Sequence, residues 1–94
     1  MMRRPVVVKK GFERAYVRLS PLNKQFVDEA LKSFSHYLVT RRAPVGLGIT
    51  HLGSQTYEFR AGLDLRIVYL AHEDQITLAL LGSHDEVRRF LKNQ

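Results

Sequence analysis

Arg60, Arg66, His84 and Glu58 have the side-chain types needed to bind and cut a phosphodiester. An arginine can hold a phosphate through two parallel hydrogen bonds and offset the negative charge that builds on its oxygens. A histidine can move the proton of a hydroxyl or of a leaving group near neutral pH, and Glu58 adds a carboxylate beside Arg60. The set predicts binding and cleavage of RNA. The alternative interpretation is a surface ion pair and a helix-capping histidine.

The spacing of apolar residues predicts the strands that carry this set. The sequence alternates with a period of two from about Thr56 to Ala61, Leu65 to His72 and Gln75 to Gly82, which indicates three strands joined as hairpins. The side chains expected to face the core are Tyr57, Phe59, Leu65, Ile67, Tyr69, Ile76, Leu78 and Leu80. The opposite face is left for the charged residues.

The turn between the first two of these strands predicts their register. If Phe59 lies opposite Ile67, the residues 62–64 form a short hairpin loop and Arg60 lies opposite Arg66. Like charges at opposed positions are unfavourable, so the face that carries them is expected to meet something negative.

The following turn is expected to bring the histidine toward this pair. With Glu73-Asp74 as the turn, Arg66 pairs with Leu81, and the chain leaves the sheet at Ser83-His84, close to Arg66. Ser83 or His84 then caps a short terminal helix. The inner side of this helix carries Val87, Phe90 and Leu91.

The N-terminal half predicts one strand and two helices. Pro5 to Lys9 is rich in β-branched residues and precedes Gly11, as expected of a short strand. Apolar residues recur at helical spacing from Phe12 to Leu19, and again after Ser20-Pro21, a favoured N-cap followed by a favoured first helical residue. The apolar face of this second helix comprises Phe26, Val27, Ala30, Leu31, Phe34 and Leu38. We therefore expect one α+β domain over residues 1–94: an N-terminal strand, a two-helix hairpin, an antiparallel three-stranded sheet and a short C-terminal helix.

Positive charge dominates the composition. Fifteen Lys and Arg against nine Asp and Glu give a net charge of +6, which favours partners rich in phosphates or acidic side chains. Arg41 and Arg42 begin the loop that runs to Gly48, and Arg88 and Arg89 lie on the last helix. These four arginines are the predicted RNA-binding residues.

Several other kinds of site are excluded by the residue types and their spacing. The chain has no cysteine, which excludes disulfides, thiolate metal sites and a cysteine nucleophile. His36, His51 and His72 lack the spacing of a helical metal pair, and no serine-nucleophile or glycine-rich phosphate-binding motif occurs. We therefore expect no metal and no cofactor. The apolar run Val6 to Val8 is too short for a signal peptide or a membrane span, so the expected location is the cytoplasm, with no membrane partner.

Three fragments in this order resemble the RelE/ParE toxin superfamily: Tyr57-Glu58-Phe59-Arg60, Leu65 to Tyr69, and Gly82 to Val87. With the early helix pair, the resemblance covers nearly the whole chain. It implies the RelE-like fold, with a basic cleft, and the toxin half of a type II toxin–antitoxin pair. In the RelE-like branch it implies ribosome-dependent cleavage of mRNA by metal-free 2′-hydroxyl attack. The implied partners are a cognate antitoxin protein with an acidic, wrapping segment, the ribosome and mRNA.

The resemblance also implies roles for the residues that match the motifs. Arg66 matches the phosphate-stabilising arginine, Arg60 falls at a basic catalytic position, and His84 falls at a general-acid position. Members often carry a tyrosine soon after this histidine, where this chain has Arg88. An arginine can stack and bind phosphate but cannot supply a proton at neutral pH. Glu58 and His84 are therefore both open as the general base.

Two alternatives to an mRNA endonuclease follow from the same resemblance. A ParE-like protein would poison DNA gyrase by binding it, although such members need no set like Arg60, Arg66 and His84. A non-catalytic protein of the RelE fold would only bind a partner or nucleic acid, and Arg88 in place of the tyrosine favours that alternative.

Overall fold

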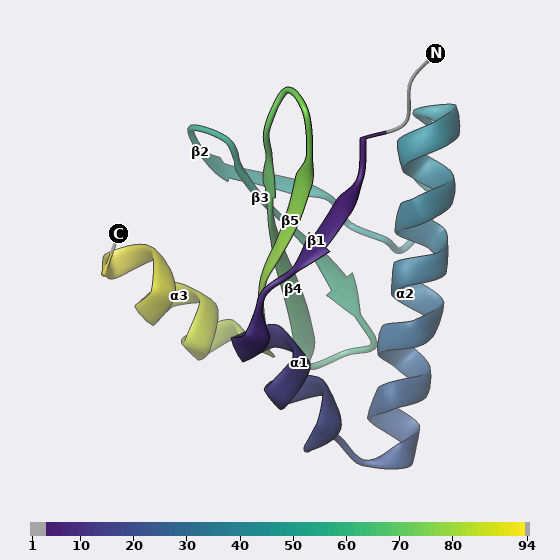
Figure 1. The fold of residues 1–94 in the computed structure, drawn as a ribbon. Coiled ribbons are helices and arrows are strands. Elements are labelled where there is room, and N and C mark those ends of the chain that lie inside the picture. Colours follow the sequence, from purple (N-terminus) through teal and green to yellow (C-terminus); the bar gives the residue numbers. More distant parts are fainter. Residues whose placement is uncertain (1–3, 94) are drawn as a thin grey trace.

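The structure is a computed structural model that describes residues 4–93, and it consists of a five-stranded sheet with helices on both faces (Figure 1). The elements are β1 (Val6–Val8), α1 (Lys10–Val17), α2 (Pro21–Thr40), β2 (Thr50–Gly53), β3 (Thr56–Ala61), β4 (Leu65–Ala71), β5 (Ile76–Ser83) and α3 (His84–Lys92). The strand order is β1-β5-β4-β3-β2, with β1 parallel to β5 and every other pair antiparallel. The predicted α+β class, the helix pair, the three-stranded hairpin series and the terminal helix are confirmed.

Strand β2 extends the predicted sheet by one strand. Its side chains are mostly exposed, and it pairs only with β3, with an irregularity in the pairing between His51 and Gly53. A polar edge strand of this kind has no buried face, so its sequence does not show the alternation that identifies a half-buried strand.

Helix α2 begins where the sequence predicts it, because Ser20 and Pro21 form a favourable start. The Ser20 hydroxyl accepts a hydrogen bond from the Asn23 amide at 3.1 Å, and Pro21 is the first helical residue. Val27, Ala30 and Phe34 are buried on the side that faces the sheet. The helix ends at Thr40, and the C-cap residue Arg41 has the left-handed φ of 63°.

An aromatic cluster joins α2 to the sheet. The ring centroids of Phe34 lie 4.5 Å from those of both Phe59 and Tyr69. Burial raises the pKa of Tyr69 above its ordinary range, so its hydroxyl stays protonated. These rings occupy the face of β3 and β4 on which the sequence predicts the core.

Helix α1 starts earlier than the apolar spacing indicates, at Lys10 rather than Phe12, and ends before Leu19. Its one buried residue is Phe12, which contributes to the same core as α2. The Tyr16 hydroxyl donates to Oδ1 of Asp28 at 2.7 Å and so joins the two helices. The helix-like spacing beyond Val17 therefore extends into the connection between them.

The pairing of β4 with β5 departs from the predicted register. Val68 pairs with Leu80 and Tyr69 with Leu78, which leaves Ala79 as an extra residue on β5. A bulge of this kind moves every later residue of the strand to the other face. Leu81 is therefore the core residue, 3% exposed, in place of the predicted Leu80, and Arg66 lies opposite Gly82 rather than Leu81.

No helix within residues 4–93 combines the length and the apolar content that crossing a membrane requires.

Candidate functional site

Glu58, Arg60 and Arg66 lie together on one face of β3 and β4, which we call the arginine face. Phe59 pairs with Ile67 and Arg60 with Arg66, so the predicted register of these two strands is confirmed. Because alternate residues of a strand point to opposite faces, the arginines point away from the core residues Phe59 and Ile67. Helices α2 and α3 lie on opposite sides of the sheet, and α3, which contacts β4 and β5, is the helix on the arginine side (Figure 1).

Arg66 is held on this face by a weak ion pair. Its Nε lies 3.8 Å from Oε2 of Glu58, and the two side chains are 18% and 15% exposed. The Nε atom is buried and has no hydrogen-bond partner among the described residues. A buried donor without an acceptor is unfavourable, and an oxygen atom of a bound ligand would satisfy it.

Arg60 is exposed and is positioned by the loop before β2. Its backbone amide donates to the carbonyl oxygen of Leu47 at 2.9 Å. A Cβ atom added to Gly48 would lie 3.3 Å from both Cδ and Nε of Arg60, and Gly48 has the left-handed φ of +63°. Gly48 therefore leaves the space along which the Arg60 side chain lies. Sequence reasoning did not identify this contact, because only the folded loop brings Gly48 to β3.

His84 is the first residue of α3 and lies near Arg66 in the sheet. The pairing places Arg66 opposite Gly82, two residues before His84. His84 is exposed, and the helix cap is Ser83, whose hydroxyl accepts from the Glu86 amide at 3.2 Å. The imidazole is therefore not needed as the cap.

Glu86 is a further carboxylate at this position that sequence reasoning did not single out. Its Oε1 accepts from the Ser83 amide at 2.9 Å, and its side chain folds back over Gly82, where an added Cβ would lie 3.0 Å from it. The sequence signal was present, since serine followed three residues later by glutamate is typical of a capping box.

The four predicted RNA-binding arginines are split between two ends of the molecule. Arg88 and Arg89 are exposed on α3, and Arg88 lies one turn after His84 on the same side of the helix. Arg41 and Arg42 follow the C-terminal end of α2, which Figure 1 places at the same end as the turn between β4 and β5. Arg60 and Arg66 lie beside the turn between β3 and β4, at the other end of the strands. The pairing thus places the start of α3, with His84, beside the end of the sheet that carries Arg66, whereas Arg41 and Arg42 lie at the other end. Arg88 lines a hollow on α3 with Asp85 and Arg89.

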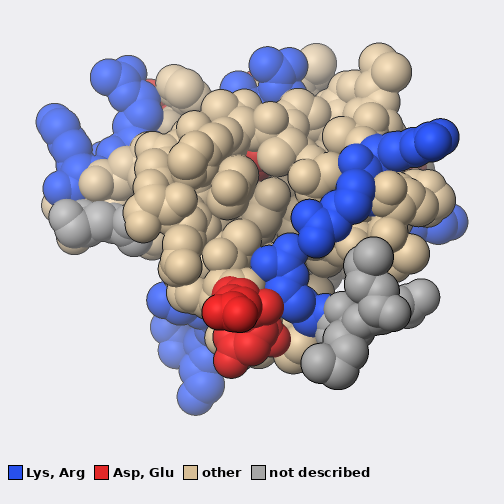
Figure 2. Space-filling model, turned by 90° about the horizontal axis from the view of Figure 1, so that it is seen from above, with Lys and Arg blue, Asp and Glu red and all other residues tan. Residues whose placement is uncertain are grey.

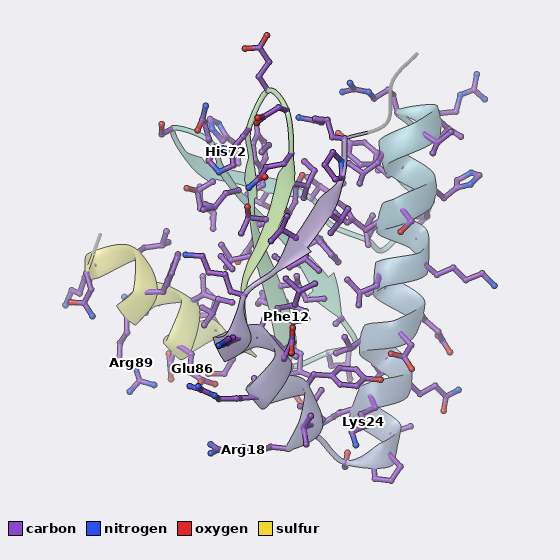
Figure 3. The ribbon with its side chains drawn as sticks, in the orientation of Figure 1. Phe12, Arg18, Lys24, His72, Glu86 and Arg89 are labelled. Atoms are coloured by element: carbon purple, nitrogen blue, oxygen red, sulfur yellow. The ribbon has the colours of Figure 1, made fainter. Side chains whose placement is uncertain are left out.

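Positive charge is not confined to this site. Figure 2 shows basic side chains around the edge of one face of the molecule, with a single prominent acidic group among them. Figure 3 shows Arg18 and Arg89 extending outward from their helices, while the buried Phe12 belongs to the core. Across the described part of the chain, no group of three or more His, Asp or Glu side chains could hold a metal ion.

The structures that resemble this fold are toxins. A copper-bound mutant toxin from Helicobacter pylori has a TM-score of 0.70 and 25% identity, covering 89% of this chain and 98% of that chain. The toxin–antitoxin complex DinJ-YafQ of E. coli has a TM-score of 0.65 at 13% identity, covering 92% and 98%. The antitoxin–toxin complex RelB-RelE of Methanococcus jannaschii has a TM-score of 0.66 at 12% identity, covering 89% and 96%. No protein-family model and no curated protein sequence matches the chain. The chain has the RelE-like toxin fold, as the resemblance in sequence predicts.

Proposed function

We propose that this chain is the toxin of a type II toxin–antitoxin pair and cleaves mRNA on the ribosome. The observation that carries the proposal is the pairing of Arg60 with Arg66 on a face where, among the described residues, one ion pair offsets the two guanidinium groups. Two opposed arginines are unfavourable without a counter-charge, and a phosphodiester supplies one. The RelE-like fold supports the same assignment, since the three solved structures named above contain toxins.

The proposed reaction uses the 2′-hydroxyl of RNA as its own nucleophile. A base removes the hydroxyl proton, the oxygen attacks the adjacent phosphorus, and the bond to the 5′-oxygen of the next nucleotide breaks. The products are a cyclic phosphate and a free 5′-hydroxyl, whose proton comes from a general acid. Because the nucleophile belongs to the substrate and arginines stabilise the charge, this reaction requires no metal ion.

Each residue near the arginine face has a role in this reaction. Arg66, with its unpartnered Nε, would bind a phosphate oxygen on which negative charge develops, and Arg60 would bind a second one. Glu58 lies beside Arg66 and is assigned as the base, while the exposed His84 is assigned as the general acid. Arg88 would bind a neighbouring phosphate or stack on a base, since it cannot supply a proton.

An antitoxin is the proposed protein partner. The net charge of +6 suits a partner whose acidic residues cover the arginine face and block the binding of RNA. The E. coli and M. jannaschii structures are themselves complexes of a toxin with an antitoxin, which supports a similar pairing here.

Induction of the protein in growing cells, with primer extension on cellular mRNA, tests the proposal. Wild type should stop growth and produce breaks at ribosomal decoding sites. Arg66→Ala and His84→Ala should each relieve both effects, whereas Lys32→Ala, on the exposed side of α2, should not. Full toxicity in the Arg66→Ala/His84→Ala protein would contradict the proposal.

The same experiment separates the two alternatives. Growth arrest with DNA damage signalling and intact mRNA would indicate a gyrase-binding toxin. Absence of both effects, with RNA still bound, would indicate a non-catalytic binding protein, which the arginine at position 88 favours.

A further inference from the structure

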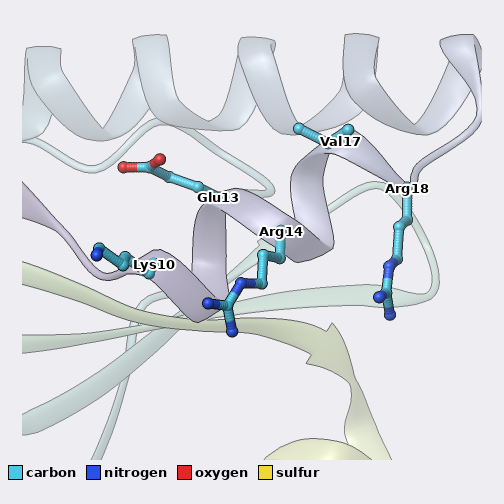
Figure 4. A pocket seen from close by; sticks show the side chains of 5 residues that line it. All are labelled: Lys10, Glu13, Arg14, Val17 and Arg18. Carbon is cyan, nitrogen blue, oxygen red and sulfur yellow. The ribbon is translucent and has the colours of Figure 1, made fainter.

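Helix α1 carries a row of basic residues that lies outside the arginine face. Lys10, Arg14 and Arg18 are each exposed and are separated by four residues, so they form one row along the helix. Figure 4 shows their side chains on one side of α1, whereas Glu13 and Val17 point to the other side, toward α2. We call this row the basic flank. At a rise of about 1.5 Å per residue, its charges follow one another at about 6 Å along the helix axis.

The basic flank is not neutralised by the protein. Within the residues that the structure describes, Arg66 and Glu58 form the one ion pair, and it lies on the sheet. Like charges four residues apart destabilise a helix, and Lys10 adds a cation at the positively polarised N-terminus of α1. The preceding Lys9 makes no side-chain capping bond. Glu13 in the first turn and the position of Arg14 and Arg18 near the C-terminal end offset part of this cost, and a polyanion beside the row would offset the rest.

The surface at the basic flank is a shallow hollow. It encloses about 410 Å³ and is lined by Lys10, Arg14 and Arg18, with Glu13 and Val17 bordering it on the side toward α2 (Figure 4). Three of these side chains are basic, Glu13 is acidic and Val17 is apolar, so the hollow has an excess of two positive charges. An extended chain of negative groups could lie in this hollow with its charges beside the three basic residues.

The opposite flank of α1 has a different character. There a groove of about 340 Å³ lies between α1 and α2, and five apolar or aromatic residues line it together with the carboxylates of Glu13 and Asp28: Val8, Phe12, Tyr16, Val17 and Leu31. Protein partners usually bind through a buried apolar or aromatic centre, which this second groove could offer and the basic flank could not. Contacts to a nucleic acid backbone depend on charge and require no apolar centre.

From this contrast we propose that the basic flank binds the sugar-phosphate backbone of RNA, at a site separate from the arginine face. Helix α1 packs with α2 in the core on the other side of the sheet from Arg60 and Arg66. A strand bound along α1 is therefore not the strand positioned for cleavage. The inference goes beyond the proposed function, because it requires neither cleavage nor a ribosome.

The test is binding of the full chain to a labelled 20-base-pair RNA duplex of arbitrary sequence, followed by fluorescence anisotropy over a series of salt concentrations. Arg14→Gln/Arg18→Gln should lower the affinity by about tenfold or more at low salt. Loss of two phosphate contacts should also reduce the slope of log affinity against log salt by about two. Arg14→Lys/Arg18→Lys keeps both charges and should keep the slope, which separates a charge effect from misfolding of α1.

A matched control removes the same charge from α2. Lys24→Gln/Lys32→Gln should retain the wild-type slope, because neither residue lies on the basic flank. An unchanged slope in the α1 variant, or an equal loss in the α2 variant, would overturn the inference. The inference would also be overturned if Arg14→Gln/Arg18→Gln lost binding to a polyglutamate peptide but kept its binding to RNA. That result would assign the basic flank to an acidic protein. Because no cleavage is measured, these outcomes are independent of whether the chain arrests growth.

Discussion

The two faces of β3 and β4 are built from alternate residues of the same strands but differ in how well their side chains satisfy one another. On the core face, Phe59 and Tyr69 pack against Phe34 with ring centroids 4.5 Å apart. On the arginine face, Arg60 lies opposite Arg66, and a buried Nε has no hydrogen-bond partner in the described structure. The core face thus stabilises the fold, whereas the arginine face retains charge that the protein does not satisfy.

The largest expected effect comes from the core face. Phe34→Ala should lower the free energy of unfolding by about 3–5 kcal/mol, because it leaves a cavity against Phe59 and Tyr69. Urea denaturation measures the loss. Leu22→Ala on the same helix is the control, since Leu22 is 59% exposed and should change stability by roughly 0.5 kcal/mol or less. A loss below about 1 kcal/mol for Phe34→Ala would show that the cluster is not the main source of stability.

The next effect should appear in activity rather than in stability. Arg66→Met should lower the rate of RNA cleavage by about 100-fold or more, because it removes a cation from the charge that develops on the phosphate. Its free energy of unfolding should change by less than about 1 kcal/mol, since loss of the 3.8 Å ion pair is offset by removal of the unsatisfied Nε. Single-turnover cleavage and urea denaturation give the two values. Equal losses in both measurements would contradict the division of roles between the faces.

A smaller effect tests how the loop before β2 positions Arg60. Gly46 and Gly48 both have a positive φ, so alanine strains the backbone at either position, but only a Cβ at Gly48 would press on Arg60. We expect the Gly48→Ala protein to bind RNA a few-fold more weakly than the Gly46→Ala protein. In an Arg60→Ala background the two alanine variants should bind RNA equally. A difference that persists there would mean that Gly48 acts on the site through something other than Arg60.

The smallest effect concerns the contact between α1 and α2, away from both faces. The hydrogen bond from Tyr16 to Asp28 raises the pKa of Tyr16 above its unfolded value. The contribution of this hydrogen bond to stability should be fully present below about pH 10 and should be lost as the pH rises through the pKa of Tyr16 in the folded protein. Wild type should therefore exceed Tyr16→Phe in stability at pH 8 and lose part of that advantage at pH 11. Tyr57→Phe is the control, since among the described residues the Tyr57 hydroxyl forms no hydrogen bond.

Much of the fold could be predicted because its signals are local. Ser20 and Pro21 mark the start of α2, and the alternation of residues gives the bounds of β3 correctly. The pairing of Arg60 with Arg66 followed from the length of one hairpin loop.

What could not be predicted depends on pairing and tertiary contact. The extra residue Ala79 is a property of the β4–β5 ladder, and nothing in the sequence of β5 alone distinguishes Leu80 from Leu81 as the core residue. The contact of Gly48 with Arg60 exists only after the loop has folded onto β3. The strand pair that carries Arg60 and Arg66 was therefore predicted correctly, but the loop that positions Arg60 was not, and the roles of the site residues stay predictions.

The parallel pairing of β1 with β5 determines when the sheet can be completed. Within residues 4–93, the strand β1 (Val6–Val8) has as its only partner a strand that begins at Ile76. Contacts between such distant segments form slowly, because a long loop must close before they contribute. During synthesis from the N-terminus, β1 remains unpaired until the chain has been made through β5. The order of translation thus delays the finished sheet, and with it the arginine face, until the last strand is available.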